Sequence, residues 1–496
     1  MRYRVTVLPD NRFFMAQEGA NLLEILRANG YAPDAPCGGK GSCGKCTVLV
    51  DNREALACQT VLTRDMSVTV RQGGSLRILR TGVNPPVRMN PVREGYLLAF
   101  DIGTTSVVCF LLDGKTGVEL ASASMLNPQT AFGADVISRI QAALEGAMEE
   151  ETGAIRRGMT QLTEQVCAQA GISPEVISVV SVVGNPAMQQ LFMGLLPDNL
   201  ARVPFGPVLT RAETVSCADY LPICANALLL VIPDISGYVG ADTMGCILST
   251  GLHEDPGITL MVDIGTNGEL VLGGQSGMIA CSTAAGPALE GANIRFGMRG
   301  TEGAVDHVWA ENGAFRCSVI GGGSPRGICG SGLIDAVAVS LELGLLNKRG
   351  RIQGSLERDG QRIIPLTEDL YLTQEDIRQV QLAKGAIRAG IQLMASKLGI
   401  GVGDIQRVLL AGAFGTFLNP ASACRIGLLP EELGDRITAV GNAAGSGAKQ
   451  LACDAEAMER CRELTGRIEF LELASLPQFP GTFARAMAFR EGKTGV

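Results

Sequence analysis

The stretch LLAFDIGTTSVVCFLLD, residues 97–113, places an acidic tight turn between two apolar runs. Each run has the length and the residue content of a buried β-strand. Asp101 ends the first run, and Gly103, Thr104 and Thr105 would form the turn of a hairpin. Such a turn offers backbone N–H groups and two hydroxyls to an anion, and a carboxylate at a strand end can hold a hydrated Mg²⁺ ion. The stretch therefore predicts a phosphate-binding hairpin.

The same pattern occurs again at 259–272, TLMVDIGTNGELVL. Asp263 lies 162 residues after Asp101, a separation that suits two duplicated α/β halves. The residues of the second turn are Gly265, Thr266 and Asn267. Two such hairpins facing each other would clamp the phosphates of one nucleotide from both sides. The alternative is a pair of unrelated tight turns, which the shared residue types in register disfavour.

These motifs resemble those of the superfamily that contains acetate and sugar kinases, heat-shock chaperones and actin. In this resemblance the Asp101 and Asp263 segments match the first and second phosphate motifs. Residues 408–417, VLLAGAFGTF, are similar to its adenosine motif, with Gly412 and Gly415 where the backbone must approach a purine and a ribose. The resemblance implies a duplicated α/β, actin-like ATPase fold of the ribonuclease H-like (ASKHA) type that binds ATP.

Two further segments resemble the helices that cross between the halves in this superfamily. They are 237–250, GYVGADTMGCILST, and 439–451, AVGNAAGSGAKQL. In sugar kinases the first of these helices carries the catalytic acid, and Asp242 stands at the matching place. In an ATPase, Asp242 would orient or deprotonate the attacking water; a helix N-cap or a solvated acid is the other interpretation. The glycine-rich stretch 327–335, GICGSGLID, either bounds the cleft or packs a helix closely on the sheet.

The stretch CGGKGSCGKC, residues 37–46, carries Cys37, Cys43 and Cys46, and Cys58 follows after eleven residues. Four thiolates with one tight pair can surround two irons bridged by sulfide, and glycines let the backbone wrap such a cluster closely. Zinc more usually takes two spaced pairs, and a Rieske centre would need two histidines near these cysteines. A disulfide is disfavoured in a reducing compartment. The pattern predicts a [2Fe–2S] cluster held by the four cysteines.

The residues around this loop predict a small sheet with one helix. Residues 3–30 read as a hairpin followed by a short helix with Asn21 as N-cap. Further strands are expected at 46–52, CTVLVDN, and at 66–71, MSVTVR. This pattern resembles the β-grasp fold of plant-type and adrenodoxin-like ferredoxins.

The chain is expected to divide into four parts. They are a ferredoxin domain at 1–72, a flexible linker at 73–95, a first ASKHA half at 96–250 and a second half at 251–496. The linker mixes Gly, Pro and Arg without periodicity, and its three prolines exclude a regular helix. We expect it to be an extended tether. The alternative is a strap packed on the next domain.

Composition excludes several functions. The net charge is −8 and no basic run occurs, so nucleic acid is not expected as a partner. No apolar stretch approaches the roughly 18 residues of a membrane span, and the N-terminus lacks the apolar core of a signal peptide. We therefore expect a cytoplasmic protein without a membrane partner. The two histidines in the chain, His253 and His307, leave little room for histidine-based catalysis.

A ferredoxin fused to an ATP-clamping fold resembles the reductive activators of corrinoid proteins, which serve methyltransferases. Similar stretches occur at 127–140, 183–192, 284–294 and 328–336. The resemblance implies a [2Fe–2S] cluster, ATP and Mg²⁺ as cofactors. It implies ATP hydrolysis coupled to one-electron reduction of the cobalt(II) corrinoid of a methyltransferase system to cobalt(I). It also implies an upstream low-potential electron donor, and it allows a homodimer through the ASKHA domain.

Two departures from the family pattern are visible in the sequence. Larger members carry an additional segment between tether and ATPase, whereas here the first phosphate strand starts near residue 96, so we expect a compact member. Other activators use a C-terminal pair of [4Fe–4S] clusters, but no CxxCxxC motif follows Cys58. The alternatives are an electron-injecting activator of another low-potential enzyme, a redox-regulated small-molecule kinase, and a scaffold that only senses nucleotide.

Overall fold

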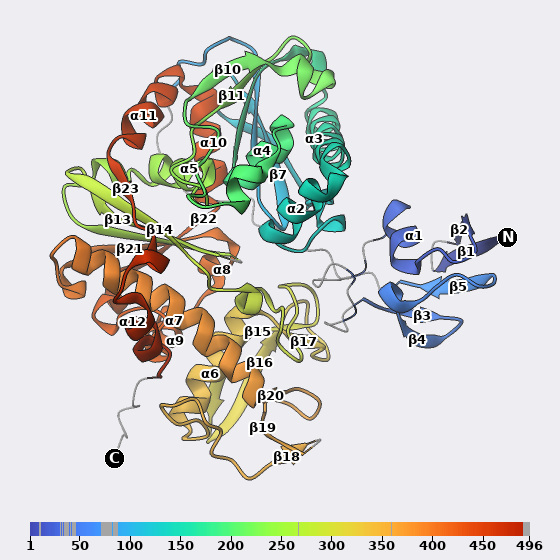
Figure 1. Ribbon diagram of the computed structural model, residues 1–496, viewed down its shortest axis with the longest axis vertical. Coiled ribbons are helices and arrows are strands. Elements are labelled where there is room, and N and C mark those ends of the chain that lie inside the picture. Colours follow the sequence, from blue (N-terminus) through green and yellow to red (C-terminus); the bar gives the residue numbers. More distant parts are fainter. Residues whose placement is uncertain are drawn as a thin grey trace.

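In the residues that it describes, the computed structural model contains one five-stranded sheet, two six-stranded sheets and two small three-stranded sheets (Figure 1). It describes residues 1–8, 11–29, 31, 33, 39, 41, 46–70, 82, 88–265, 267–358 and 360–489. Three predicted site residues, Cys37, Cys43 and Thr266, lie outside this described part. Within the part that is described, no helix combines the length and the apolar character needed to cross a membrane.

The N-terminal domain is a five-stranded sheet in the order β2-β1-β5-β3-β4, crossed by helix α1 (blue in Figure 1). Strand β1 pairs antiparallel with β2 and parallel with β5. The side chain of Asn21 accepts a hydrogen bond from the N–H of Leu23 at 3.0 Å, so the predicted N-cap is confirmed. The β-grasp ferredoxin fold is confirmed as well. Its elements are β1 (Arg2–Leu8), β2 (Arg12–Gln17), α1 (Leu22–Ala28), β3 (Thr47–Val50), β4 (Arg53–Leu56) and β5 (Met66–Thr69).

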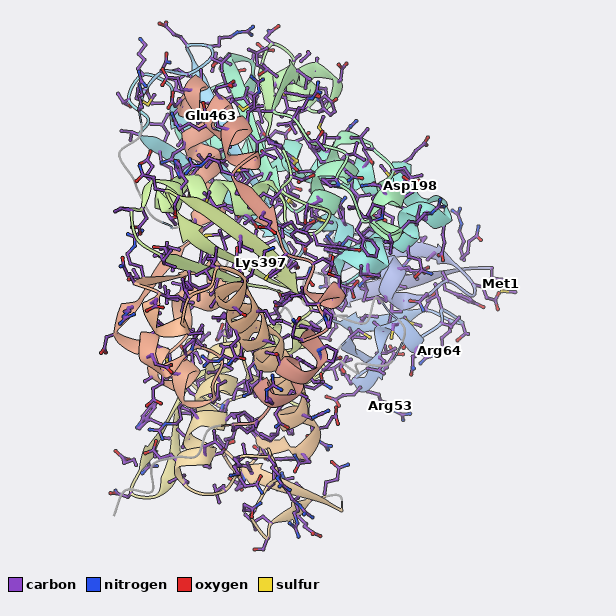
Figure 2. All side chains as sticks on the ribbon, turned by 60° about the vertical axis from the view of Figure 1, so that its left-hand side comes forward. Met1, Arg53, Arg64, Asp198, Lys397 and Glu463 are labelled. Carbon is purple, nitrogen blue, oxygen red and sulfur yellow. The ribbon has the colours of Figure 1, made fainter. Side chains whose placement is uncertain are left out.

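The domain's core follows from the alternation along its strands. Val5 and Val7 of β1 are fully buried against Leu22 and Leu26 of α1 in one apolar cluster. Figure 2 shows the domain from another side, with Met1, Arg53 and Arg64 around its outer surface.

The first large sheet has the order β10-β11-β9-β6-β7-β8. Strands β6, β7 and β8 form an antiparallel meander, whereas β9 and β11 run parallel to β6. Helices α2, α3 and α4 share one apolar core with this sheet. The elements are β6 (Tyr96–Ile102), β7 (Ser106–Asp113), β8 (Glu119–Leu126), α2 (Val136–Ala142), α3 (Met148–Ala170), β9 (Ile177–Gly184), α4 (Pro186–Met193), β10 (Glu213–Ser216), β11 (Leu228–Val231) and α5 (Ala241–Thr250).

The second large sheet has the order β22-β21-β12-β13-β14-β23, with a subdomain inserted between β14 and β21. The sheet strands are β12 (Thr259–Ile264), β13 (Gly268–Gly274), β14 (Gly277–Thr283), β21 (Arg407–Ala411), β22 (Ile437–Gly441) and β23 (Ile468–Phe470). The inserted elements are β15 (Ala304–Glu311), β16 (Ala314–Val319), β17 (Gly327–Ile328), α6 (Gly330–Glu342), β18 (Glu357–Arg358), β19 (Gln361–Pro365), β20 (Tyr371–Thr373) and α7 (Gln374–Lys397). The remaining helices are α8 (Gly412–Phe417), α9 (Pro420–Arg425), α10 (Ala443–Cys453), α11 (Ala455–Thr465) and α12 (Phe479–Ala486).

The two large sheets repeat one topology. In each, three strands form an antiparallel meander, and two later strands add in parallel beside the first strand of that meander. The parallel strand β9, ISVVSVVG, is buried along its whole length, as expected for a strand covered on both faces. The predicted duplicated, actin-like α/β fold is confirmed.

Helices α5 and α10 pack in one apolar core with strands of both large sheets and so join the two halves. A Cβ atom on Gly447 would lie 2.2 Å from the carbonyl oxygen of Gly245, so the two helix backbones are in direct contact. The hydroxyl of Ser249 on α5 donates to the carbonyl oxygen of Ala443 at 2.7 Å, and that of Ser181 on β9 donates to Ala448 at 2.6 Å. Each of the two predicted segments contains the expected helix, α5 in 237–250 and α10 in 439–451, and the two halves share one core.

The described end of the linker is packed rather than free. Asn90 exchanges backbone hydrogen bonds of 2.8 Å with Cys453 and Ala455, at the junction of α10 and α11. Arg93 donates to the carbonyl oxygen of Asn226 in the first half at 2.6 Å. Residues 88–95 are therefore a strap packed on the next domain, which was the alternative to a free tether. Residues 71–81 and 83–87 lie outside the described part.

Candidate nucleotide and cluster sites

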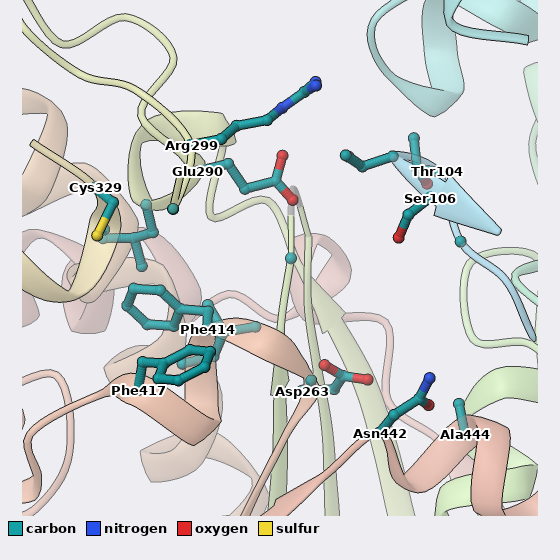
Figure 3. Close-up of a pocket in the computed structure, with 18 of the residues that line it drawn as sticks. Thr104, Ser106, Asp263, Glu290, Arg299, Cys329, Phe414, Phe417, Asn442 and Ala444 are labelled. Carbon is teal, nitrogen blue, oxygen red and sulfur yellow. The ribbon is translucent and has the colours of Figure 1, made fainter. Parts of the chain in front are cut away.

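One pocket lies between the two large sheets and takes residues from both halves (Figure 3). Most of the predicted nucleotide-binding residues that the structure describes line it, together with Asp242. These are Asp101, Gly103, Thr104, Thr105, Asp263, Gly265, Asn267 and Gly412. The structure therefore brings two acidic hairpins, 162 residues apart in the sequence, to one cavity.

The predicted residue Gly415 does not line the pocket. A Cβ atom there would lie 2.9 Å from Cβ of Leu410, so this glycine lets α8 pack closely on β21. Phe414 and Phe417 of the same helix do line the pocket, and Figure 3 shows their rings on the side near Cys329. The adenosine-motif segment thus contributes two aromatic rings and Gly412 to the pocket.

The acidic side chains of the pocket are held in an environment that favours their neutral forms. Burial raises the pKa of Asp101 to about 7, against the hydrogen bond that Asn442 donates to it at 2.9 Å. Burial, then the charges of Asp242 and Asp101, raise the pKa of Asp263 to about 7. Burial also raises the pKa of Asp242 to about 6. A cation that enters among these carboxylates would stabilise their charged forms.

Asp242 lies in the first turn of α5 and is not its N-cap, because Gly240 occupies that position. One carboxylate oxygen of Asp242 accepts the N–H of Thr243 at 2.7 Å. Nor is Asp242 a solvated acid on the outer surface, the other alternative, because its side chain lines the pocket. Asp242 is therefore placed where it could act on a water beside bound phosphate.

Sequence reasoning missed several polar residues of the pocket. Glu269, two residues beyond the second turn, lines the pocket, and burial followed by the charges of Asp242 and Asp263 raises its pKa well above the ordinary value. Asn442 caps α10 by accepting the N–H of Gly445 at 2.6 Å while its amide holds Asp101. Glu269 could have been found from the sequence, because it is a charged residue within the otherwise apolar strand β13. Nothing in the sequence pattern separates Asn442 from an ordinary cap.

The glycine-rich stretch 327–335 fulfils both of its predicted alternatives. Cys329, Gly330 and Ser331 line the pocket where α6 begins. A Cβ atom on Gly332 would lie 2.4 Å from the carbonyl oxygen of Val305 in β15, so the close packing of α6 on that sheet also requires glycine.

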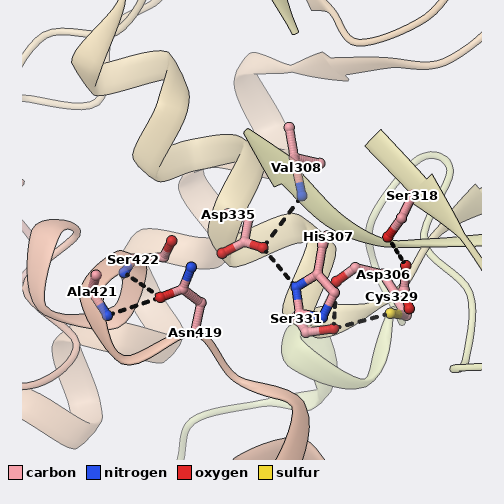
Figure 4. A network of polar contacts seen from close by, with 10 residues as sticks. All are labelled: Asp306, His307, Val308, Ser318, Cys329, Ser331, Asp335, Asn419, Ala421 and Ser422. Atoms are coloured by element: carbon pink, nitrogen blue, oxygen red, sulfur yellow. Dashed lines mark hydrogen bonds and ion pairs between the residues drawn. The ribbon is translucent and has the colours of Figure 1, made fainter. Parts of the chain in front are cut away.

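A polar network fixes this start of α6 against β15 (Figure 4). Ser331 donates to the carbonyl oxygen of Asp306 at 2.9 Å. His307 Nδ1 lies 3.1 Å from the buried carboxylate of Asp335, which also accepts the N–H of Val308 at 3.3 Å. His307 therefore braces one wall of the pocket from outside it.

The pocket fits a hydrated Mg²⁺ better than a bare ion. Asp101, Asp242, Asp263 and Glu269 all line it, yet no three acidic, cysteine or histidine side chains of the described residues converge closely enough to hold a metal ion by themselves. Mg²⁺ usually retains several waters and binds through one or two carboxylates plus substrate phosphates. The donor set matches that arrangement.

Cys46 and Cys58, the two predicted cluster ligands that the structure describes, fit an iron–sulfur cluster. Cys46 and Cys58 are neighbours, since the N–H of Cys58 donates to Sγ of Cys46 at 3.4 Å. Gly39 of the loop has φ +90°, and a Cβ atom there would lie 3.8 Å from Cβ of Cys58. Gly39 thus lies close to Cys58, and amide donation to sulfur is a feature that stabilises bound clusters.

Three family models match successive parts of the chain. The 2Fe–2S iron–sulfur cluster binding domain matches residues 5–66, the RACo middle region matches 96–255, and the C-terminal domain of RACo, the ASKHA domain, matches 257–495.

Alignments with two curated proteins cover most of the chain. The corrinoid activation enzyme RamQ of Eubacterium limosum is 34% identical, covering 93% of this chain and 94% of the relative. The [Co(II) methylated amine-specific corrinoid protein] reductase of Methanosarcina barkeri is 25% identical over 75% of this chain and 73% of its own length.

A solved structure supports the same relationship. A reductive activator for a corrinoid, iron–sulfur protein superposes with a TM-score of 0.74 and 26% identity, covering 98% of both chains. The family resemblance inferred from the ferredoxin and phosphate motifs is confirmed. The chain belongs to the family of reductive activators of corrinoid proteins.

Proposed function

We propose that this protein couples ATP hydrolysis to the delivery of one low-potential electron to the cobalt(II) corrinoid of a methyltransferase partner, restoring cobalt(I). The observation that carries the proposal is the meeting of two acidic phosphate hairpins and Asp242 in one cleft, in a chain that begins with a ferredoxin domain. The family relationship supplies the corrinoid protein as substrate.

The chemistry explains why the two activities share one chain. Moving one electron uphill by 59 mV costs about 1.4 kcal/mol, so a gap of a few tenths of a volt costs several kcal/mol. ATP binding that closes the cleft would favour one conformer, and that conformer would bind the corrinoid protein differently in its two oxidation states. Hydrolysis would then return the protein to its open form.

The hairpins would bind the nucleotide and its cation. Asp101 and Asp263 stand at the ends of the equivalent strands β6 and β12, and each would accept a water of hydrated Mg²⁺. The turns that follow would donate N–H groups to phosphate oxygens. Gly412, with φ +77°, would admit the nucleoside beside Asp263.

Asp242 would orient or deprotonate the attacking water. Its pKa of about 6 leaves it ionised at neutral pH while keeping it basic enough to accept a proton. Glu269 is the competing candidate, since it lines the same wall. Its carboxyl is more strongly biased toward the neutral form, which cannot accept a proton, so the pKa shifts favour Asp242 as the base. The two candidates can be told apart by substitution, because replacing the true base should slow ATP hydrolysis without weakening Mg-ATP binding.

The N-terminal domain would accept electrons from an upstream low-potential donor. When bound by Cys37, Cys43, Cys46 and Cys58, a [2Fe–2S] cluster supplies one-electron transfer. The domain contacts the first half through Arg27, whose Nη1 donates to the carbonyl oxygen of Ala131 at 3.4 Å.

The direct experiment mixes the purified protein with a corrinoid methyltransferase subunit in the cobalt(II) state, a reductant and Mg-ATP. The proposal expects the cobalt(I) absorption band to appear with ATP and not without it. Phosphorylation of a small metabolite in the absence of any corrinoid protein would favour the kinase alternative instead.

Two variants separate the parts of the proposal. Cys46→Ser should remove the cluster absorbance and cobalt(I) formation while Mg-ATP affinity stays unchanged. Asp242→Asn should retain Mg-ATP affinity and hydrolyse ATP about 100-fold more slowly. Unchanged turnover in Asp242→Asn, together with slow turnover in Glu269→Gln, would assign the base to Glu269.

A further inference from the structure

Two buried side chains hold the first phosphate hairpin from behind. Asn127 Nδ2 donates to the carbonyl oxygen of Gly103 at 2.8 Å, and Arg139 Nη2 donates to that of Thr104 at 2.5 Å. Asn127 and Arg139 are fully buried, and neither is among the residues that line the pocket. Both contacts are therefore made on the side of the turn that faces away from the nucleotide cleft.

The direction of these carbonyls determines where the following amides point. In a trans peptide the C=O of one residue and the N–H of the next point in opposite directions. Because the carbonyls of Gly103 and Thr104 point toward Asn127 and Arg139, the N–H groups of Thr104 and Thr105 are turned toward the cleft. Among the residues that the structure describes, neither amide has a hydrogen-bond acceptor.

We propose that Asn127 and Arg139 are positioning residues that hold the amides of Thr104 and Thr105 ready to bind a nucleotide phosphate. The inference rests on the proposed ATP-dependent function and adds to it the residues that shape the first phosphate site. Successive N–H groups that converge on one concavity form a favourable anion site. Fixing them before the ligand arrives reduces the ordering cost of binding.

The surroundings of Arg139 support a positioning role. Its Nε donates to the carbonyl oxygen of Gly133 at 3.0 Å and its Nη1 contacts Sδ of Met188 at 3.1 Å. Burial lowers its pKa to about 10, so the guanidinium stays charged at neutral pH. Removing such a group from water is costly, and an apolar side chain of similar shape would often fold as well. The charges of Glu151 and Asp135 offset part of that cost, and the carbonyl oxygens of Gly133 and Thr104 accept hydrogen bonds from the guanidinium.

Neighbouring side chains hold the same turn. The N–H of Asn127 donates to the carbonyl oxygen of Thr105 at 2.9 Å. Asn185, the N-cap of α4, donates from its amide to the hydroxyl of Thr104 at 3.1 Å. The segments 127–140 and 183–192, which resemble the family outside the phosphate motifs, thus meet at this hairpin.

The test uses the full chain and the variant Asn127→Asp. The carboxylate keeps the acceptor that takes the N–H of Gln129 at 2.9 Å but loses the donor to Gly103. Gln129→Met is the matched control, because Gln129 is equally buried and its amide donates to Glu151 rather than to the hairpin. Calorimetry measures the Kd for Mg-ATP and for adenosine.

The proposal expects Asn127→Asp to weaken Mg-ATP binding about tenfold or more, with adenosine affinity changed less than about twofold. The ¹⁵N–¹H signals of threonine-labelled protein should show two amides that shift with Mg-ATP in the wild type and not in the variant. Gln129→Met should leave both affinities and both signals unchanged. Arg139→Lys, which keeps the charge but loses the planar fork, should fall between wild type and Asn127→Asp.

Other outcomes overturn the proposal. Wild-type affinity for Mg-ATP in folded Asn127→Asp, or equal losses for ATP and adenosine, would reduce the two residues to structural supports. If Asn127→Asp does not fold, wild-type behaviour of Arg139→Lys in both assays has the same consequence. Failure of the wild type to bind Mg-ATP would refute the proposed function itself. The behaviour of the variants, in contrast, tests only the positioning role of Asn127 and Arg139.

Discussion

The two phosphate hairpins share a sequence motif but differ in how the protein supports them. Asp101 accepts a hydrogen bond from Asn442 of the opposite half, and its turn is braced by Asn127 and Arg139. Asp263 has no side-chain donor among the residues that the structure describes, and its carboxylate is surrounded by Asp242 and Asp101. If both hairpins bind Mg-ATP as proposed, the first is held in place before the ligand arrives, whereas the second needs the cation of the ligand to compensate its charge.

The largest effect on Mg-ATP affinity is expected from substituting the aspartates of the two hairpins, Asp101 and Asp263. Asp263→Asn should weaken Mg-ATP binding about 100-fold, because this carboxylate depends on the cation for charge compensation. Asp101→Asn should weaken it about tenfold, since Asn442 already compensates part of the charge of Asp101. Calorimetry with Mg-ATP measures both. Equal losses would show that the hairpins contribute symmetrically.

A backbone change tests the close approach beside the second hairpin. Gly412 has φ +77°, and a Cβ atom there would lie 2.6 Å from Oδ1 of Asp263. Gly412→Ala should therefore displace this carboxylate and weaken Mg-ATP binding about tenfold, with an unchanged ferredoxin absorption spectrum. Gly403→Ala is the control, because a Cβ atom there meets nothing within 4 Å. Normal affinity in Gly412→Ala would mean that Asp263 can move without loss.

The pH dependence of binding should report the shared acidic pocket. The pKa values of Asp101 and Asp263 are raised to about 7, so protons must leave when the cation binds. Mg-ATP affinity should fall as the pH is lowered from 8 to 6, by about tenfold for each carboxylate that must ionise. Asp263→Asn should show a shallower dependence. A flat profile in the wild type would contradict the assignment of these groups to the cation.

The smallest expected effect is on stability without ligand. Folding raises the pKa of Asp263 from 3.8 to about 7, so the folded state holds a proton that the unfolded chain loses at lower pH. This disfavours folding increasingly as the pH rises from about 4 to about 7, and fully above that range. Asp263→Asn should raise the Tm by a few degrees at pH 8 and by less at pH 5. A lower Tm at pH 8 would contradict the raised pKa.

The sequence predicted those parts of the site that repeat or match a family pattern. Asp101 and Asp263 end two strands of like composition, so their meeting follows from duplication of one topology. The segments 237–250 and 439–451 were recognisable as crossing helices from their resemblance to the superfamily that contains sugar kinases and actin. Cys46 and Cys58 could be predicted as two of the four cluster ligands because the cysteines of such a site have a characteristic spacing.

The residues that sequence reasoning missed act through tertiary contacts that no spacing reveals. Arg139 lies in a short helix, where an arginine usually faces solvent; here it is buried because the Thr104 carbonyl lies beside it. Asn442 is an ordinary helix cap in sequence, and only the packing of α10 between the halves brings it to Asp101. The end of the linker was expected to be a free tether, but Asn90 pairs with the backbone at the α10–α11 junction.

The central claim, that the nucleotide clamp controls electron delivery, is tested most directly by stopped-flow mixing. Protein that has been reduced and freed of excess reductant is mixed with a cobalt(II) corrinoid protein, with or without Mg-ATP, while the visible absorbance of iron–sulfur and cobalt is followed. The account predicts that the cluster absorbance returns together with cobalt(I) formation in the presence of Mg-ATP, and that both changes are absent without it and in Asp263→Asn. Cobalt(I) formation at the same rate without nucleotide would contradict the account.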